Sequence, residues 1–177
     1  MLTILCFLLA ILPTEKRNIR ADKAKSYISY KAVHKLHAWE GKNKVAECVM
    51  VYDDATGFVD KVAVSAKVVD FNSGNSSRDS HALEVLEGIK YPKVTFVSTG
   101  IIAIGSSNKF LVRGNLTFHG ITKPVSFEMK QTKTSSKIIA EGVFSILLTD
   151  YKVERPTFMF ITTDDKMDLD LYMVFNL

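Results

Sequence analysis

The chain has 177 residues, of which 47 % are hydrophobic and 24 % are charged, and its formal net charge is +4. This length fits one folded domain, and the ordinary composition excludes a disordered chain and a low-complexity polymer. After residue 20 no basic run is longer than two residues, so the charge pattern of a nucleic-acid-binding protein is absent.

The first segment, residues 2–12, is apolar except for Thr3, and Pro13 and a polar stretch follow it. The segment is too short to span a bilayer but has the length typical of the apolar core of a secretory signal peptide. We therefore predict a leader over residues 1–24, with the cleavage site left open, and a folded domain over residues 25–177. Export would place the protein in the periplasm or outside the cell. The alternative is an apolar N-terminal segment that frays or is buried.

Cys48 is the only cysteine beyond the predicted leader, so no internal disulfide is expected. It alternates with Ala46, Met50 and Tyr52, and no cationic neighbour is evident that would activate it. This pattern predicts a buried free thiol.

From Tyr27 onward, apolar and polar residues alternate with a period of two, which predicts antiparallel strands with one buried and one solvated face. Short polar turns separate the runs. Such a series leaves two exposed edges unless the sheet closes, so we predict an all-β, eight-stranded antiparallel barrel. The predicted strands cover residues 27–33, 42–52, 58–70, 94–104, 110–118, 124–132, 138–148 and 167–176.

Two connections have clear local signals. Residues 80–88 predict one short helix, which Ser80 can cap and Gly88 can end. Before the strand at 124–132, Gly120 is free to adopt positive φ, and Pro124 is expected to open the strand.

The inward face of the predicted barrel is large, apolar and almost free of charge. An eight-stranded barrel has room for side chains or for one small ligand, so this face fits both a cavity and a filled core. The predicted cavity lining is Val62, Val64, Val68, Phe96, Phe110, Val112, Leu116, Phe118, Phe127, Met129, Phe144, Ile146, Leu169, Leu171 and Met173.

A polar cluster, Arg78-Asp79-Ser80-His81, lies beside an apolar region at the start of the predicted helix. It is either a charge-paired loop that anchors the helix or a cavity mouth that meets a polar head group, since an Arg side chain binds phosphate or carboxylate oxygens in pairs. Trp39 is either a plug at the barrel end or a ligand contact. The predicted mouth residues are Trp39, Arg78 and His81.

The sequence contains no nucleophile elbow, phosphate loop, dinucleotide motif or zinc motif, so neither catalytic residues nor a cofactor are predicted. His34 and His37 are three residues apart, which on one strand places them on opposite faces. They could share a metal ion only if a turn lay between them. His119 is predicted to be a turn residue.

Several motifs occur together in the second half of the chain: Arg78-Asp79-Ser80-His81, then Lys90-Tyr91-Pro92-Lys93-Val94-Thr95-Phe96, then Leu116-Thr117-Phe118-His119-Gly120-Ile121-Thr122-Lys123-Pro124, then Asp150-Tyr151-Lys152-Val153. In this order they resemble the YceI-like, polyisoprenoid-binding family of bacteria. The resemblance covers about residues 27–177. It implies a lipocalin-like barrel with a long apolar cavity, in a secreted or periplasmic protein that binds an isoprenoid or related amphiphile and has no established catalytic residues.

We therefore predict an exported, non-enzymatic protein that holds a long apolar amphiphile, such as a polyisoprenoid, another lipid or a quinone, with possible transient contact with a membrane. One alternative is a structural or stress-related barrel with a filled interior that acts through a protein partner. An interior without a void above about 300 Å³ would favour that alternative. A third reading is an enzyme at the barrel mouth, with Arg78, Asp79, His81 and His119 as its clustered titratable groups.

Overall fold

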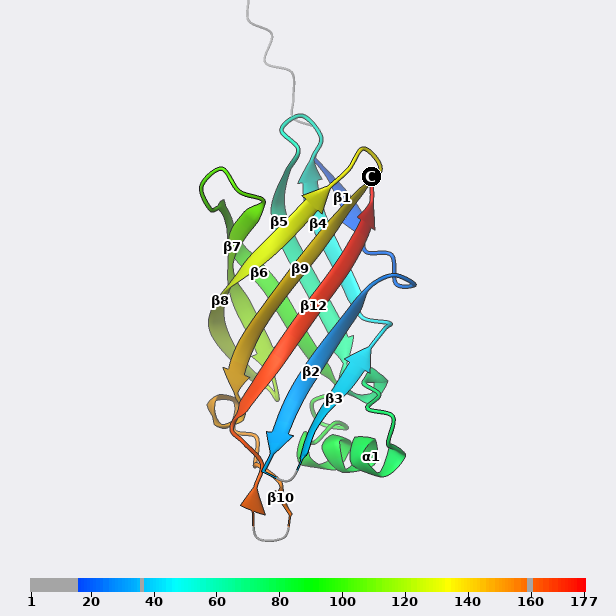
Figure 1. Cartoon of the computed structure of the whole chain (residues 1–177), viewed down its shortest axis with the longest axis vertical. Helices are drawn as coiled ribbons and strands as arrows, with labels where there is room; N and C mark the ends of the chain where they lie inside the picture. The colour runs from blue at the N-terminus through cyan, green and yellow to red at the C-terminus, as the bar shows by residue number, and fades with distance from the viewer. Residues whose placement is uncertain (1–15, 36, 159–160) are drawn as a thin grey trace, which may run out of the picture.

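The structure is a computed structural model that describes residues 16–35, 37–158 and 161–177. Within these residues, ten antiparallel strands form one curled sheet in the order β1-β4-β5-β6-β7-β8-β9-β12-β2-β3 (Figure 1). The lipocalin-like, all-β antiparallel barrel is confirmed, with ten sheet strands where eight were predicted. The strands are β1 Lys16–Arg20, β2 Tyr27–His34, β3 His37–Asn43, β4 Glu47–Asp53, β5 Phe58–Lys67, β6 Lys93–Ala103, β7 Lys109–Phe118, β8 Ile121–Lys133, β9 Lys137–Leu147 and β12 Lys166–Asn176.

The sheet curls until its two edges are covered. On one side Ala21 forms a bridge with Phe175, and the Asp22 N–H donates to the Val174 carbonyl at 2.7 Å. On the other side Lys42 in β3 exchanges two backbone hydrogen bonds with Asn72, at 2.9 and 3.1 Å. These bonds satisfy backbone groups that an open sheet would leave exposed at its edges.

The predicted strand over residues 42–52 is wrong, because a turn at residues 44–46 divides it between β3 and β4. Asn43 explains the break. Its side chain is fully buried, accepts the Val45 N–H at 2.9 Å and donates to the Lys67 carbonyl at 3.2 Å. An Asn side chain that bonds the backbone two residues further on forms an Asx turn, which competes with continued strand pairing.

The first strand lies inside the segment that the sequence assigned to a leader. β1 pairs with β4 from Lys16 opposite Asp53 to Arg20 opposite Val49, and Ile19 is buried. Because β1 pairs with β4, the barrel includes residues before 25. Residues 1–15 lie outside the described residues, and a leader there stays a prediction.

The two ends of the barrel differ in what covers them. We call the end that carries the β4–β5, β6–β7 and β8–β9 turns the upper end, and the opposite end the lower end (Figure 1). The lower end carries α1 and the short elements that flank the cavity described below. These elements are η1 Val68–Asp70, α1 Ser76–Val85, η2 Leu148–Tyr151, β10 Thr157–Phe158 and β11 Ile161–Thr162.

Helix α1 begins earlier than predicted. The Asn75 side chain, rather than Ser80, caps it by accepting the Arg78 N–H at 3.0 Å. The helix ends at Val85, and the Gly88 N–H then donates to the Leu83 carbonyl at 2.8 Å. None of the residues of α1 is buried.

The turn between β7 and β8 consists of His119 and Gly120, with φ values of +49° and +73°. Two successive positive φ values match the tight hairpin turn whose twist suits paired strands, so the predicted positive φ of Gly120 is confirmed. Pro124 lies inside β8, opposite Asn115, instead of opening the strand. The β8–β9 pairing covers only Met129 to Lys133. Pro124 lies outside it, so its missing N–H costs no hydrogen bond to β9.

Candidate functional site

The lower half of the barrel contains an apolar cavity of about 180 Å³. Strand side chains form its wall, and α1 and the segment after η2 cover its end. Among the described lining residues Asp79 is the only charged one. The lining is Ile28, Tyr30, Ala32, Trp39, Val64, Ala66, Val68, Phe71, Asp79, Ala82, Leu83, Val85, Leu86, Val94, Thr95, Phe96, Leu116, Phe118, Phe127, Phe144, Ile146, Leu148, Val153, Pro156, Thr163, Met167, Leu169 and Leu171.

Ten of the fifteen side chains that the sequence placed in a cavity lining do line this cavity. Three aromatic rings of the lining contact one another: Phe127 stacks on Phe144 with ring centroids 4.4 Å apart, and it meets Phe96 in a tilted arrangement at 5.6 Å. The ten residues are Val64, Val68, Phe96, Leu116, Phe118, Phe127, Phe144, Ile146, Leu169 and Leu171. Their contact with a ligand stays a prediction.

The other five predicted lining residues belong to packed parts of the barrel. Val62 and Met173 pack in the cluster of buried residues that contains Cys48, Met50, Tyr52 and Ile138, which we call the upper cluster. Val112 and Met129 pack in the cluster around Phe127. Phe110 packs against Phe58 with ring centroids 6.3 Å apart. A period of two correctly assigns the inward face but carries no information on the height at which the interior is empty.

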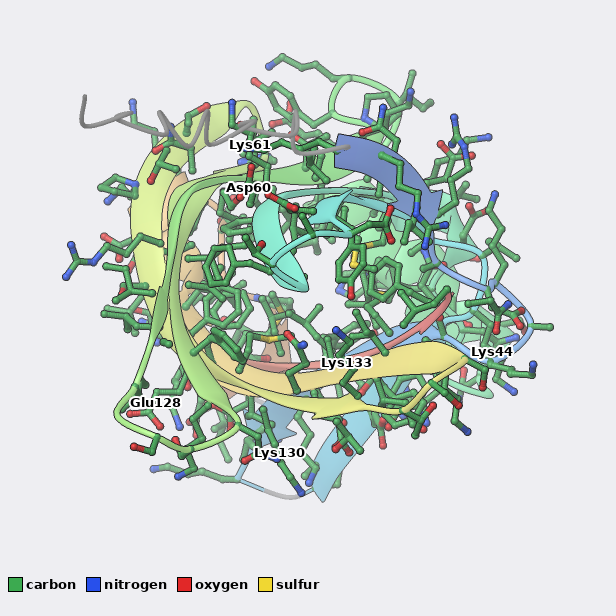
Figure 2. The ribbon with its side chains drawn as sticks, turned by 90° about the horizontal axis from the view of Figure 1, so that it is seen from above. Lys44, Asp60, Lys61, Glu128, Lys130 and Lys133 are labelled. Carbon is green, nitrogen blue, oxygen red and sulfur yellow. The ribbon has the colours of Figure 1, made fainter. Side chains whose placement is uncertain are left out.

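Tyr52 lies beside the β4–β5 turn at the upper end and is 3 % exposed. Two cations lie over its ring, the Arg17 guanidinium at 5.9 Å and the Lys133 ammonium at 5.3 Å. Figure 2 shows Lys133 turned to the inside of the barrel, while Glu128 and Lys130 of the same strand lie outside. Cation–π contact explains how a lysine can occupy an inward position here.

Several of the lining residues missed from the sequence come from β2 and α1. Ile28, Tyr30 and Ala32 alternate along β2, and that alternation could have identified them. Ala82 and Leu83 come from α1, and only the placement of the helix across the barrel end reveals them. No residue of α1 is fully buried, although Val85 packs against the cluster around Phe127.

Arg78 bonds locally, to Ser73 in the loop before α1. Its Nε donates to Ser73 Oγ at 2.9 Å and its Nη2 donates to the Ser73 carbonyl at 2.8 Å. Its guanidinium lies 5.8 Å from the Trp39 ring, and Trp39 lines the cavity. The arginine therefore joins the η1–α1 loop to the cavity mouth.

Asp79 bonds to the same serine. Its Oδ1 accepts the Ser73 hydroxyl at 2.5 Å and the Ser73 N–H at 3.1 Å, and Oδ2 lies 3.2 Å from that N–H. Trp39 and Tyr30 both line the cavity, and burial raises the pKa of the Tyr30 hydroxyl. Asp79, Tyr30 and Trp39 thus give the cavity a small polar rim on the α1 side.

The predicted mouth role of His81 is not supported by its position. His81 lies on the exposed side of α1, where its Nδ1 is 3.6 Å from Glu84 Oε2. The side chain is 61 % exposed and is not part of the cavity lining among the described residues.

His34 and His37 are direct cross-strand partners, with ring centroids 5.7 Å apart. The turn that the sequence analysis required between them exists, so the expectation of opposite faces on one strand is wrong. His34 Nε2 lies 3.0 Å from the Ile161 carbonyl. No group of three or more His, Cys, Asp or Glu residues that could hold a metal ion occurs in the described part of the chain.

His119 is more than a turn residue. Its side chain is 8 % exposed, with Nδ1 2.9 Å from the Tyr151 carbonyl and Nε2 2.9 Å from Glu87 Oε2. Lys90 and, to a smaller extent, His119 lower the pKa of Glu87. His119 therefore links the β7–β8 turn to η2 and to the segment after α1, and it is committed to these partners instead of to Arg78 and Asp79.

Cys48 is a buried free thiol, as predicted, with 3 % exposure. Burial raises its pKa to about 12. It packs in the upper cluster, so it takes no part in the cavity.

Within the described residues, no helix has both the length and the apolar character needed to cross a membrane.

Comparison with known proteins identifies the family. The model of the YceI-like domain matches residues 20–175. The chain is 30 % identical over 108 residues to Protein YceI of Salmonella newport, which covers 59 % of this chain and 56 % of that protein, so the match spans just over half of this relative. It is 28 % identical over 154 residues to a UPF0312 protein of Pseudomonas putida (strain GB-1), covering 82 % of this chain and 74 % of that one.

Solved structures show the same fold at low identity. BcnA of Burkholderia cenocepacia superposes with a TM-score of 0.77 and 22 % identity, covering 87 % of this chain and 98 % of that one. A polyisoprenoid binding domain from Saccharophagus degradans superposes with a TM-score of 0.71 and 13 % identity, covering 90 % of this chain and 99 % of that one. The family model spans nearly the whole described barrel, and the chain therefore belongs to the YceI-like family.

Proposed function

We propose that this chain is an exported protein that holds a long apolar amphiphile, such as a polyisoprenoid or a related lipid or quinone, in the lower cavity. The observation that carries the proposal is an apolar cavity whose described lining residues include a single charged one, covered by a helix that has no fully buried residue. The polyisoprenoid binding domain of Saccharophagus degradans has the same fold, which supports this ligand class.

The size of the cavity sets a condition on binding. Its volume of about 180 Å³ is below the usual ~300–1,000 Å³ of small-molecule sites, so a long chain enters only if α1 moves outward. Burial of one isoprene-length segment removes about 100 Å² of apolar surface and stabilises the complex by roughly 2–3 kcal/mol. Several such segments would offset the cost of displacing a helix that makes few buried contacts.

The filled barrel that acts through a protein partner is the second candidate, and the small volume of the cavity favours it. Exposed apolar residues at the lower end, Ile89 at 101 % and Val69 at 62 %, would suit a partner surface. Catalysis is not part of our proposal, because Asp79 bonds to Ser73, His119 bonds to Glu87, and the exposed His81 lies 3.6 Å from Glu84.

Trp39 provides a direct assay, because it is the only tryptophan and lines the cavity. We expect a shift in its emission when the full chain is titrated with farnesol or a longer polyprenol, and a matching mass shift by native mass spectrometry. Ala32→Phe, which fills the cavity beside Trp39, should abolish both signals. Val33→Phe, on the neighbouring outward position of β2, should leave them unchanged.

A helix variant protects this test against misfolding of Ala32→Phe. Ala82→Phe projects into the cavity from α1, and Ser80→Phe places the same ring on the exposed side of the helix. Binding that survives both inward substitutions, or wild-type protein that binds neither prenol, would contradict the cavity proposal. The second result would favour the filled barrel.

A further inference from the structure

We propose that the cavity selects an amphiphile with an uncharged, hydroxyl-bearing head group, and that Asp79 at the mouth discriminates against an anionic head group such as a phosphate. This inference rests on the proposed function and adds the chemistry of the ligand head.

The first observation is the charge of the lining. Among the described residues that line the cavity, Asp79 is the only charged one, and neither Lys nor Arg contributes. An anion that leaves water needs a paired cation or several donors, because burial of an unpaired charge is costly. A phosphate drawn into this mouth would meet a carboxylate instead, and like charges at close range oppose binding.

The second observation is the commitment of Arg78, the cation next to Asp79 in the chain. Its Nε and Nη2 both bond to Ser73, and its guanidinium plane lies over Trp39. These contacts turn the fork of the arginine toward the η1–α1 loop. A phosphate could bind Arg78 side-on through Nε and Nη2 only by displacing Ser73, and Nη1 is the guanidinium nitrogen that has no bond to Ser73.

The third observation is the spare acceptor capacity of Asp79. Oδ1 accepts the Ser73 hydroxyl at 2.5 Å and the Ser73 N–H at 3.1 Å, whereas Oδ2 has only the 3.2 Å share of that same N–H. A carboxylate offers about four acceptor positions. Oδ2 is therefore the acceptor for a ligand O–H, and the Tyr30 hydroxyl lies on the same rim.

Trp39 emission tests this with two ligands that differ only in the head: farnesol and farnesyl monophosphate. We expect wild type to bind the alcohol at least about tenfold tighter than the phosphate, which corresponds to the usual cost of a poorly placed like charge. Asp79→Asn keeps the size of the side chain and should reduce that ratio by about tenfold. Asp70→Asn, which removes the same charge from η1 outside the cavity lining, should leave the ratio unchanged.

Arg78→Ala supplies an independent check. Because Arg78 serves Ser73 and Trp39, its removal should change the two affinities by the same factor. Selective loss of phosphate binding in Arg78→Ala, equal binding of both ligands by wild type, or an unchanged ratio in Asp79→Asn would each overturn the inference while the cavity proposal survived. Wild-type protein that bound neither ligand would overturn both.

Discussion

The upper and lower halves of the barrel have the same alternation of inward apolar residues but fill their interiors differently. In the upper half, small and flexible side chains such as Ala46, Cys48 and Met50 pack together, and each is at most 7 % exposed. In the lower half, stacked rings such as Phe127 and Phe144 pack in fixed orientations and border the cavity. Unbranched side chains adapt to irregular gaps, whereas rigid rings leave space. The cavity lies in the half that contains the stacked Phe127 and Phe144 rings.

The largest expected contrast comes from the same substitution in each half. Met50→Ala removes a side chain that is 1 % exposed in the upper cluster and should lower the free energy of unfolding by about 2–5 kcal/mol. Met167→Ala, in a half-buried residue that borders the cavity, should cost less than about 1 kcal/mol. Urea denaturation measures both values. Equal losses would show that the two halves are equally packed.

Enlarged side chains should show the opposite tolerance. Ala46→Phe overpacks the upper cluster and should cost about 1–3 kcal/mol of stability. Ala32→Phe has the cavity to expand into and should cost less than about 1 kcal/mol, while it blocks the ligand. Thermal unfolding followed by circular dichroism compares them. A larger loss for Ala32→Phe would mean that the cavity wall is stiffer than the upper core.

Thiol labelling should separate the two halves by rate. Because burial raises the pKa of Cys48 to about 12, roughly one thiol in ten thousand is ionised at pH 8. Its reaction with a disulfide reagent should therefore be as slow as global unfolding. A thiol introduced by Val85→Cys in a Cys48→Ser background, at a half-buried position of α1 that lines the cavity, should react orders of magnitude faster. Similar rates would contradict a closed upper half.

The smallest expected effect concerns acid pH at the lower end. Asp165 accepts the Thr149 hydroxyl at 2.7 Å and the Thr149 N–H at 2.9 Å, and these bonds lower its pKa below the ordinary 3.8. A lowered folded-state pKa gives a contribution that is fully present above the unfolded pKa and is lost as the pH falls through the folded pKa. Asp165→Asn should therefore flatten the fall of the thermal midpoint below about pH 4. Thr149→Val should do the same, and an unchanged slope in both variants would exclude this anchor.

The sequence predicted the barrel and the inward face of each long strand, since alternation with a period of two is a local signal. It failed where a single side chain redirects the backbone. Asn43 ends β3 by bonding to Val45 and Lys67, and Asn75 starts α1 ahead of Ser80. Both asparagines act through hydrogen bonds that become visible only once the partners are placed.

The site was predicted only in part, for a related reason. Alternation placed Leu116 and Phe127 on the inward face, and both line the cavity. It equally placed Val62 and Met173 inward, although these pack in the upper cluster. Which inward residues border empty space depends on how side chains from several strands fit together, and no single strand encodes that.

The closing contacts of the barrel have a consequence for how the chain folds. Asn176 donates to Asp22 at 3.4 Å and the Val174 N–H donates to Ser26 Oγ at 3.0 Å, so the seam joins residues separated by 154 and 148 positions. Loop-closure entropy makes contacts between such distant residues slow to form, and folds rich in them fold in milliseconds to seconds. The seam cannot form until the last strand has emerged, so a partly synthesised or partly translocated chain presents an open sheet with two bare edges. The sheet edges of this protein are therefore protected from edge-to-edge aggregation only once its last strand is in place.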